Sequence, residues 1–128
     1  MGQCYAIRLK AVFKDSEGAA KALRKKIERG DEEHTDYSLD HCQQMGAGTD
    51  TLDGLLRIIF GGWNCRLDKD EKGVLHSSFS CSYGWEGVMI SAFDEMAPFL
   101  KDESYIKIYP DSGCDHCVVK DGKPVWKS

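Results

Sequence analysis

Apolar and polar residues alternate along two segments of the chain, residues 4–14 and 74–84. In the first segment the alternation brings Tyr5, Ile7 and Leu9 to one side and leaves basic residues on the other. The second segment has a similar apolar side, opposite a side made of histidine and serines. A period of two is typical of a strand with one buried face, so both segments are predicted strands.

Three other segments repeat apolar residues at spacings of three and four, which indicates amphipathic helices. They are residues 16–30, 51–62 and 85–100. Residues whose side chains accept hydrogen bonds from free amides precede the first two helices, and glycines follow them, as expected at helix ends. The candidate caps are Asp15 or Ser16 for the first helix and Thr49 or Thr51 for the second.

The C-terminal part of the chain predicts a helix end followed by strands. Pro98 lacks the amide hydrogen that a helix interior needs, so the third helix should kink or tighten in its last turn. Residues 104–110, 117–120 and 123–127 are short alternating segments, and the Asp-Gly pair before the last one is typical of a hairpin turn.

This order of elements predicts the fold class. Helices and strands in the order strand, helix, helix, strand, helix and then strands indicate an α+β two-layer sandwich. We expect a mainly antiparallel sheet with about three helices on one face. At 128 residues the chain is expected to form a single domain, residues 1–128.

Composition narrows the function classes. The chain is 41% hydrophobic and 30% charged, which is typical of a soluble globular protein. Its net charge of −4 disfavours nucleic-acid binding, for which a basic surface supplies most of the affinity. No apolar run approaches the roughly 20 residues of a membrane-spanning helix, and no secretion signal is recognised. We therefore expect a cytoplasmic protein that does not enter a membrane.

Two surfaces are candidates for contact with a partner. Residues 31–50 show no clear period, which is typical of a functional or mobile loop. The helix predicted at residues 16–30 carries a basic group on its outer face. Cations late in a helix also complement its dipole, so this group has a structural explanation as well. Its members are Lys21, Arg24, Lys25, Lys26 and Arg29.

The six cysteines raise the question of a metal site, although a reducing cytoplasm would keep them as free thiols. Cys114 and Cys117 form a Cys-x-x-Cys pair, which supplies half of a tetrahedral zinc site. His41 and Cys42 are the candidates for the other two ligands. We favour the competing interpretation, in which Cys117 packs under the sheet and Cys114 lies at a turn. A redox role is disfavoured because a strand, not a helix, follows Cys117.

The segment Gly-Trp-Glu-Gly joins the second strand to the third helix. Trp85 begins the apolar stripe of this helix, and both Trp85 and Glu86 are candidate contact residues. Glu86 falls in the first helical turn, where a carboxylate interacts favourably with the helix dipole and caps amides. Catalysis is the alternative role for Glu86. Asp94 and Glu95 lie off the apolar stripe, and we expect them in solvent.

Three features of the second half of the chain carry a resemblance to a group of other small proteins. They are the "SYGWEG" turn, the helix that ends in "APFL", and the hairpin from "YIKIYPD" to "KDGK". Through them, residues 74–125 resemble a group of small bacterial proteins of unknown function, found in phage-derived and other mobile elements. The resemblance implies a ferredoxin-like build. It assigns no catalytic residue, and the "CDHC" sequence is not expected of this group.

These patterns together favour a small cytoplasmic binding or interaction module that is not an enzyme. A protein partner is preferred because the net charge disfavours nucleic acid. An open edge or face of the sheet makes a homodimer a further expectation. Two alternatives stay open: a structural-zinc module that uses Cys114 and Cys117, and a small enzyme that depends on a cysteine or on Glu86.

Overall fold

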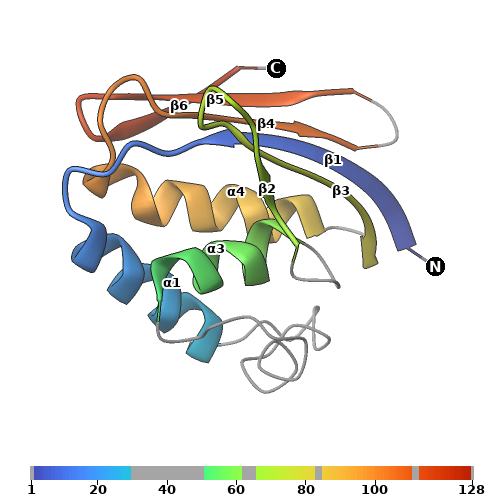
Figure 1. The fold of residues 1–128 in the computed structure, drawn as a ribbon, viewed down its shortest axis with the longest axis horizontal. Coiled ribbons are helices and arrows are strands. Elements are labelled where there is room, and N and C mark those ends of the chain that lie inside the picture. The colour runs from blue at the N-terminus through green and yellow to red at the C-terminus, as the bar shows by residue number, and fades with distance from the viewer. Residues whose placement is uncertain (1, 30–50, 62–65, 83–84, 111–112, 128) are drawn as a thin grey trace.

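The fold is an α+β sandwich of one antiparallel sheet and a layer of helices (Figure 1). The computed structural model describes residues 2–29, 51–61, 66–82, 85–110 and 113–127. The helices in this part are α1 (Ser16–Arg29), α3 (Leu52–Phe60) and α4 (Trp85–Met96), which continues into the short 3-10 helix η2 (Ala97–Phe99). The strands are β1 (Gly2–Lys10), β2 (Asp68–Lys69), β3 (Leu75–Ser82), β4 (Tyr105–Tyr109), β5 (Asp115–Lys120) and β6 (Lys123–Lys127).

The described strands form one six-stranded sheet in the order β2-β3-β1-β4-β5-β6. Each recorded pairing in this sheet is antiparallel. The predicted two-layer α+β architecture is therefore confirmed. The finer prediction of a ferredoxin-like build is not confirmed by this strand order.

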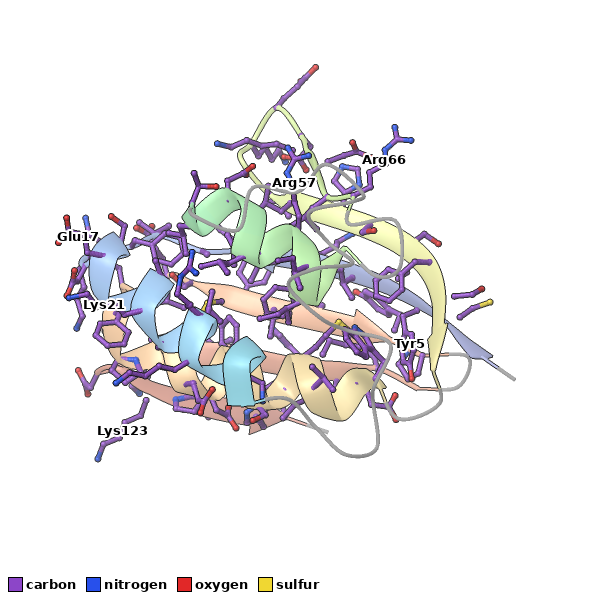
Figure 2. All side chains as sticks on the ribbon, turned by 90° about the horizontal axis from the view of Figure 1, so that it is seen from below. Tyr5, Glu17, Lys21, Arg57, Arg66 and Lys123 are labelled. Atoms are coloured by element: carbon purple, nitrogen blue, oxygen red, sulfur yellow. The ribbon has the colours of Figure 1, made fainter. Side chains whose placement is uncertain are left out.

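The helices cover one face of the sheet and leave the other face open (Figures 1 and 2). Between the two layers lies a hydrophobic cluster whose largest members are almost completely buried. These members include Tyr5, Phe60, Trp85 and Phe93. Burial of this size supplies most of the favourable free energy of folding, so the covered face is the structural side of the sheet.

The ends of the helices are where the sequence pattern placed them. Thr51 Oγ1 accepts a hydrogen bond from the Gly54 amide at 3.1 Å, and Asp15 Oδ1 accepts one from the Gly18 amide at 3.0 Å. At the other end of α3, the Gly61 amide donates to the Arg57 carbonyl at 2.9 Å. A Cβ at Gly61 would collide with the backbone of Arg57 and of Arg66, so only glycine fits this turn.

The last turn of the third helix and the C-terminal hairpin also confirm the predictions. The α-helix tightens into η2 at the position of Pro98. Asp121 and Gly122 have φ angles of 53° and 73°, which is the left-handed pair required by a two-residue hairpin turn. β5 and β6 therefore pair directly, with Val118 opposite Val125.

One strand was not predicted. The charged segment from residue 66 to residue 73 has no alternating pattern that would predict a strand, but two of its residues form β2 at the edge of the sheet. Asp70 then closes the turn to β3, because its Oδ1 accepts hydrogen bonds from the amides of Lys72 and Val74, both at 2.9 Å. The loop expected at residues 31–50 lies outside the described residues. No helix in the described part has the length and apolar character needed to cross a bilayer.

Candidate anion-binding face

The open face of the sheet collects side chains from all of its strands. Alternation in β1 buries Tyr5, Ile7 and Leu9 under the helices, so the intervening residues point outward. Residues paired across neighbouring strands share a face, and the recorded registers therefore define a row that crosses the whole sheet. From one edge to the other this row is Asp68, His76, Arg8, Lys107, His116 and Lys127.

This outer face is basic although the chain as a whole is acidic, with a net charge of −4. The same alternation brings six cations to it from the described strands, against a single carboxylate, that of Asp68. Charges on one surface act together on an approaching ligand, so the local balance matters more than the sum over the chain. The six cations are Arg8, Lys10, Lys107, Lys120, Lys123 and Lys127. We call the outward side chains of the described strands the basic face.

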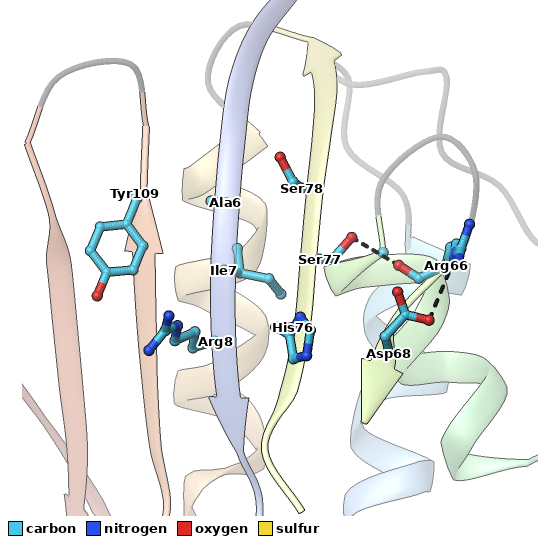
Figure 3. Close-up of a pocket in the computed structure, with 10 residues that line it drawn as sticks. Ala6, Ile7, Arg8, Arg66, Asp68, His76, Ser77, Ser78 and Tyr109 are labelled. Atoms are coloured by element: carbon cyan, nitrogen blue, oxygen red, sulfur yellow. Dashed lines mark hydrogen bonds and ion pairs between the residues drawn. The ribbon is translucent and has the colours of Figure 1, made fainter. Parts of the chain in front are cut away.

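A hollow of about 630 Å³ lies on the basic face, over strands β1 and β3. Tyr109 and Arg8 lie on one side of this hollow, and Arg66 and Asp68 lie on the other (Figure 3). His76 and Ser78 extend from β3 between these two sides (Figure 3). Its lining therefore offers cations, hydroxyl groups and one aromatic ring to a ligand.

The side of the hollow formed by Arg66 and Asp68 is held in place by polar contacts. Ser77 Oγ donates a hydrogen bond to the Arg66 carbonyl at 2.9 Å, which ties this segment to β3. Arg66 Nε lies 3.4 Å from Asp68 Oδ1 in an exposed ion pair. The one carboxylate of the face is thus already paired with a cation, so it opposes an incoming anion less than a free carboxylate would.

A second hollow extends the basic face past Arg8. It is lined by Arg8, Lys69, Lys72 and Tyr105, together with the acidic turn at Asp70 and Glu71. The pKa of Asp70 is lowered, and the largest cause is the hydrogen bond that its carboxylate accepts from the Val74 amide. This carboxylate therefore stays ionised. Arg8 lines both hollows and stands near the middle of the sheet. Any ligand that spans the two hollows would pass this guanidinium.

The cations of the face contribute to a lowered pKa of His116. Burial is the largest cause that lowers the pKa of His116, and repulsion from Lys107 and Lys127 lowers it further. His116 also meets the ring of Tyr105 edge-on, with 6.3 Å between the ring centres. Lys107 Nζ lies 5.7 Å from the centre of the same Tyr105 ring. The imidazole is therefore held neutral between cations, and a bound anion would favour its protonation.

The predicted basic helix surface is only partly exposed, and it lies on the opposite layer from the basic face. Lys21 and Lys25 are exposed, whereas Arg24 is half-buried. Lys26 is also half-buried, because its Nζ donates a hydrogen bond of 2.9 Å to Ser91 Oγ on α4. The side chain of Arg29 lies outside the described part. The helix therefore presents fewer free cations than its sequence suggested.

Trp85, one of the candidate contact residues, is buried. Its side chain is 1% exposed, and its Nε1 donates a hydrogen bond of 3.0 Å to the Ile59 carbonyl. This bond satisfies the only polar group of the indole and links α4 to α3. The tryptophan belongs to the core, as the apolar stripe of its helix also indicated.

Glu86 is half-buried in the first turn of α4. Burial raises the pKa of Glu86 most, and the nearby carboxylate of Asp115 on β5 raises it further. Its Oε2 is buried, and no hydrogen bond to this atom is recorded among the described residues. The expected capping contact is therefore not seen at this oxygen, and the two carboxylates lie on the covered side of the sheet, away from the basic face.

Asp94 corrects the expectation of a solvated carboxylate. It is half-buried, and its Oδ1 accepts a hydrogen bond of 2.6 Å from Trp126 Nε1. The Trp126 ring also meets Phe93 edge-on, with 6.2 Å between the ring centres. These contacts join the edge strand β6 to α4, so Asp94 serves the packing of the two layers.

The two cysteines of the Cys-x-x-Cys pair lie in different surroundings. Cys117 is 0% exposed on the covered side of β5, and Cys114 is exposed just before the strand begins. Burial raises the pKa of the Cys117 thiol to about 12. His41 and Cys42, the other proposed metal ligands, lie outside the described residues. Within the described ranges, no group of three or more histidine, cysteine or acidic side chains is placed to hold a metal ion.

The basic face was missed by the sequence analysis. Alternation correctly placed Arg8 and Lys10 on the polar side of the first strand, and this was the available signal. The row could not be assembled from it, because the row depends on which strands are neighbours and in what register. The net charge of −4 also gave no indication that one face of the sheet is basic.

The comparisons with known proteins give no match. No family model matches the chain, and neither the curated proteins nor the solved structures contain one that does. The resemblance to small proteins of mobile elements consequently stays a prediction.

Proposed function

We propose that this protein is a small binding module without enzymatic activity, and that it binds an anionic partner through the basic face. The observation that carries the proposal is the row of cations across the sheet, where the outward side chains of the described strands include one carboxylate, Asp68, which Arg66 already pairs. Such a field attracts anions and orients them before contact. An acidic segment of a protein, the kind of partner that the sequence favoured, is one ligand of this charge.

The functional groups of the basic face support binding more than catalysis. Lysine, arginine and tyrosine side chains bind anions through charge and hydrogen bonds. The nucleophile that the enzyme alternative would need is not supplied by Cys117, because a buried thiol with a pKa of about 12 stays protonated at neutral pH. Glu86 lies on the covered side of the sheet, so it cannot act on a ligand that is bound to the basic face on the other side.

A cytoplasmic location is part of the proposal. Cys4, Cys114 and Cys117, the cysteines whose side chains the structure describes, are free thiols. Two of them are exposed, and exposed thiols persist in a reducing compartment.

A homodimer, expected from the open sheet, finds less support than an anionic partner. Two basic faces would repel each other if they met. The edges of the sheet are the two-residue β2 and the strand β6, which carries Lys123, Pro124 and Lys127. Short edge strands, prolines and lysines are features that prevent pairing with another chain.

Charge reversal on the two opposite layers tests where the anion binds. The double variant Lys107→Glu/Lys127→Glu changes the basic face, and Lys21→Glu/Lys25→Glu changes α1 by the same amount of charge. We expect the first variant to elute from a heparin column at much lower salt than the native protein, and the second to elute close to it. Circular dichroism would check that both variants are folded.

Because the two variants have equal net charge, a difference in elution reports position on the surface. If the α1 variant lost retention and the sheet variant kept it, the basic helix surface would be the binding site and the proposal would be wrong. Equal loss in both would mean that retention follows net charge alone, which would also contradict a specific face.

A further inference from the structure

We infer that the anionic partner is a single-stranded nucleic acid, with its phosphates along the row of cations and one base stacked on Tyr109. This inference rests on the proposed function, because it names the partner of the same face. It also revises the expectation drawn from net charge, since phosphate contacts depend on the local surface rather than on the whole chain.

The kind of cation on the face favours phosphates over an acidic protein segment. Five of the six cations are lysines, the exception being Arg8. Lysine is depleted from the cores of protein–protein interfaces, because its charge is strongly hydrated and its side chain loses much rotational freedom on ordering. It is a common contact of the nucleic-acid backbone, where it neutralises phosphates and releases their counterions.

The spacing of the row suits an extended strand. Arg8, Lys107 and Lys127 come from β1, β4 and β6, and neighbouring strands lie about 4.8 Å apart. The neutral His116 stands between the two lysines, on β5. These three cations thus span roughly 14 Å at right angles to the strands, a path along which successive phosphates of one strand could be neutralised.

Aromatic rings on the same face distinguish a single strand from a duplex. Tyr105 and Tyr109 project from one side of β4, about 13 Å apart along the strand. Tyr109 lines the hollow over β1 and β3, and Figure 3 shows its ring beside this space. A base must leave its partner to stack on such a ring, and unpaired bases do so with little regard to sequence.

The surroundings of the Tyr109 ring offer the remaining contacts that a nucleotide needs. Arg8 lies on the neighbouring strand, and Ser78 extends from β3 toward the same hollow (Figure 3). A guanidinium binds a phosphate through two parallel hydrogen bonds, and a hydroxyl can donate to or accept from a base edge or a sugar. The hollow therefore combines the three chemical elements of nucleotide recognition: charge, stacking and hydrogen bonding.

Fluorescence anisotropy with labelled oligonucleotides of about 12 residues, as RNA and as DNA, would test the inference. We expect the native protein to bind single strands of either kind more tightly than a duplex. With about three phosphates neutralised, the logarithm of the affinity should fall with the logarithm of salt concentration with a slope of about −2. Unlabelled poly-glutamate should compete poorly.

Three variants separate stacking from charge. Tyr109→Ala should weaken binding roughly tenfold or more at every salt concentration and leave the slope unchanged, because it removes a stacking contact. Tyr109→Phe keeps the ring and should bind nearly as the native protein does. Lys107→Gln should instead make the slope shallower by about 0.7, because one phosphate contact is lost.

The outcomes distinguish failure of this inference from failure of the proposed function. Retention on heparin through the basic face, without binding of single strands, would overturn the inference and leave an anion-binding module. Competition by poly-glutamate equal to that of oligonucleotides would point to an acidic protein partner instead. Equal binding of duplex, or unchanged binding by Tyr109→Ala, would contradict the stacking arrangement.

Discussion

At the scale of single residues, Cys114 and Cys117 show how backbone alternation separates neighbours in the sequence. Cys117 enters the core beneath β5, while Cys114 precedes the strand and stays in solvent. This arrangement was favoured over a metal knuckle because the Cys-x-x-Cys pair supplies only half of a tetrahedral zinc site. The reactivity of the two thiols should therefore differ sharply.

Alkylation of the native protein by iodoacetamide at about pH 8 should modify Cys4 and Cys114 and leave Cys117 unmodified. The first two are exposed, whereas the Cys117 thiol is buried, with a pKa of about 12. Mass spectrometry of proteolytic peptides reads each site, and alkylation in denaturant is the control that every thiol can react. Protection of Cys114 together with Cys117, with zinc bound to the protein, would instead support the metal alternative.

Glu86 predicts a pH dependence of stability. Burial and Asp115 raise the pKa of Glu86, so the folded protein holds a proton there more readily than the unfolded chain does. The ionised carboxylate therefore costs stability at neutral pH, and this cost disappears as the pH falls below the ordinary range of glutamate. The group is half-exposed, and solvent screening limits the effect to about 0.5 kcal/mol.

Glu86→Gln should accordingly raise the free energy of unfolding at about pH 7 and change it little at about pH 4. Urea unfolding at both pH values measures this difference. Glu17→Gln is the matched control, because Glu17 is exposed in the first turn of α1, where a carboxylate favours the helix dipole. A loss of stability in Glu86→Gln at neutral pH would show that the carboxylate makes a favourable contact.

At the scale of elements, the local pattern was sufficient for helices and for most strands. The caps at Asp15 and Thr51, the tightened turn at Pro98 and the hairpin turn at Asp121 all depend on residues within a few positions of each other. β2 was missed because a two-residue strand has no period to detect, and only its pairing with β3 defines it. Local chemistry therefore predicts the ends of elements better than very short edge strands.

The cap of α3 can be tested by removal of a single hydroxyl. Thr51→Ala eliminates the hydrogen bond to the Gly54 amide and should lower the free energy of unfolding by about 1 kcal/mol. For a chain of this length the melting temperature should fall by about 3–5 °C. Thr51→Ser keeps the hydroxyl and should lose much less. Thermal denaturation measures the melting temperature of both variants. Equal decreases in Thr51→Ala and Thr51→Ser would indicate that the methyl group stabilises the fold and the hydroxyl cap does not.

At the scale of the whole molecule, the distribution of charge carries information that its sum does not. The chain is acidic, yet one side of its sheet is basic because alternation in several strands points cations the same way. Predicting this required the strand order β2-β3-β1-β4-β5-β6, which brings Arg8 beside Lys107 and His76. That order results from packing across the core rather than from any local pattern, so the candidate site could not be predicted from the sequence.

The central position of β1 has a consequence for how the molecule is made. This strand is synthesised first, but its two neighbours are residues 75–82 and residues 105–109. It cannot complete its backbone hydrogen bonds until residues 105–109 have left the ribosome, and contacts between such distant segments form slowly. The apolar side of β1 thus stays unprotected until these later strands are available, and it is the segment that a chaperone would be expected to shield.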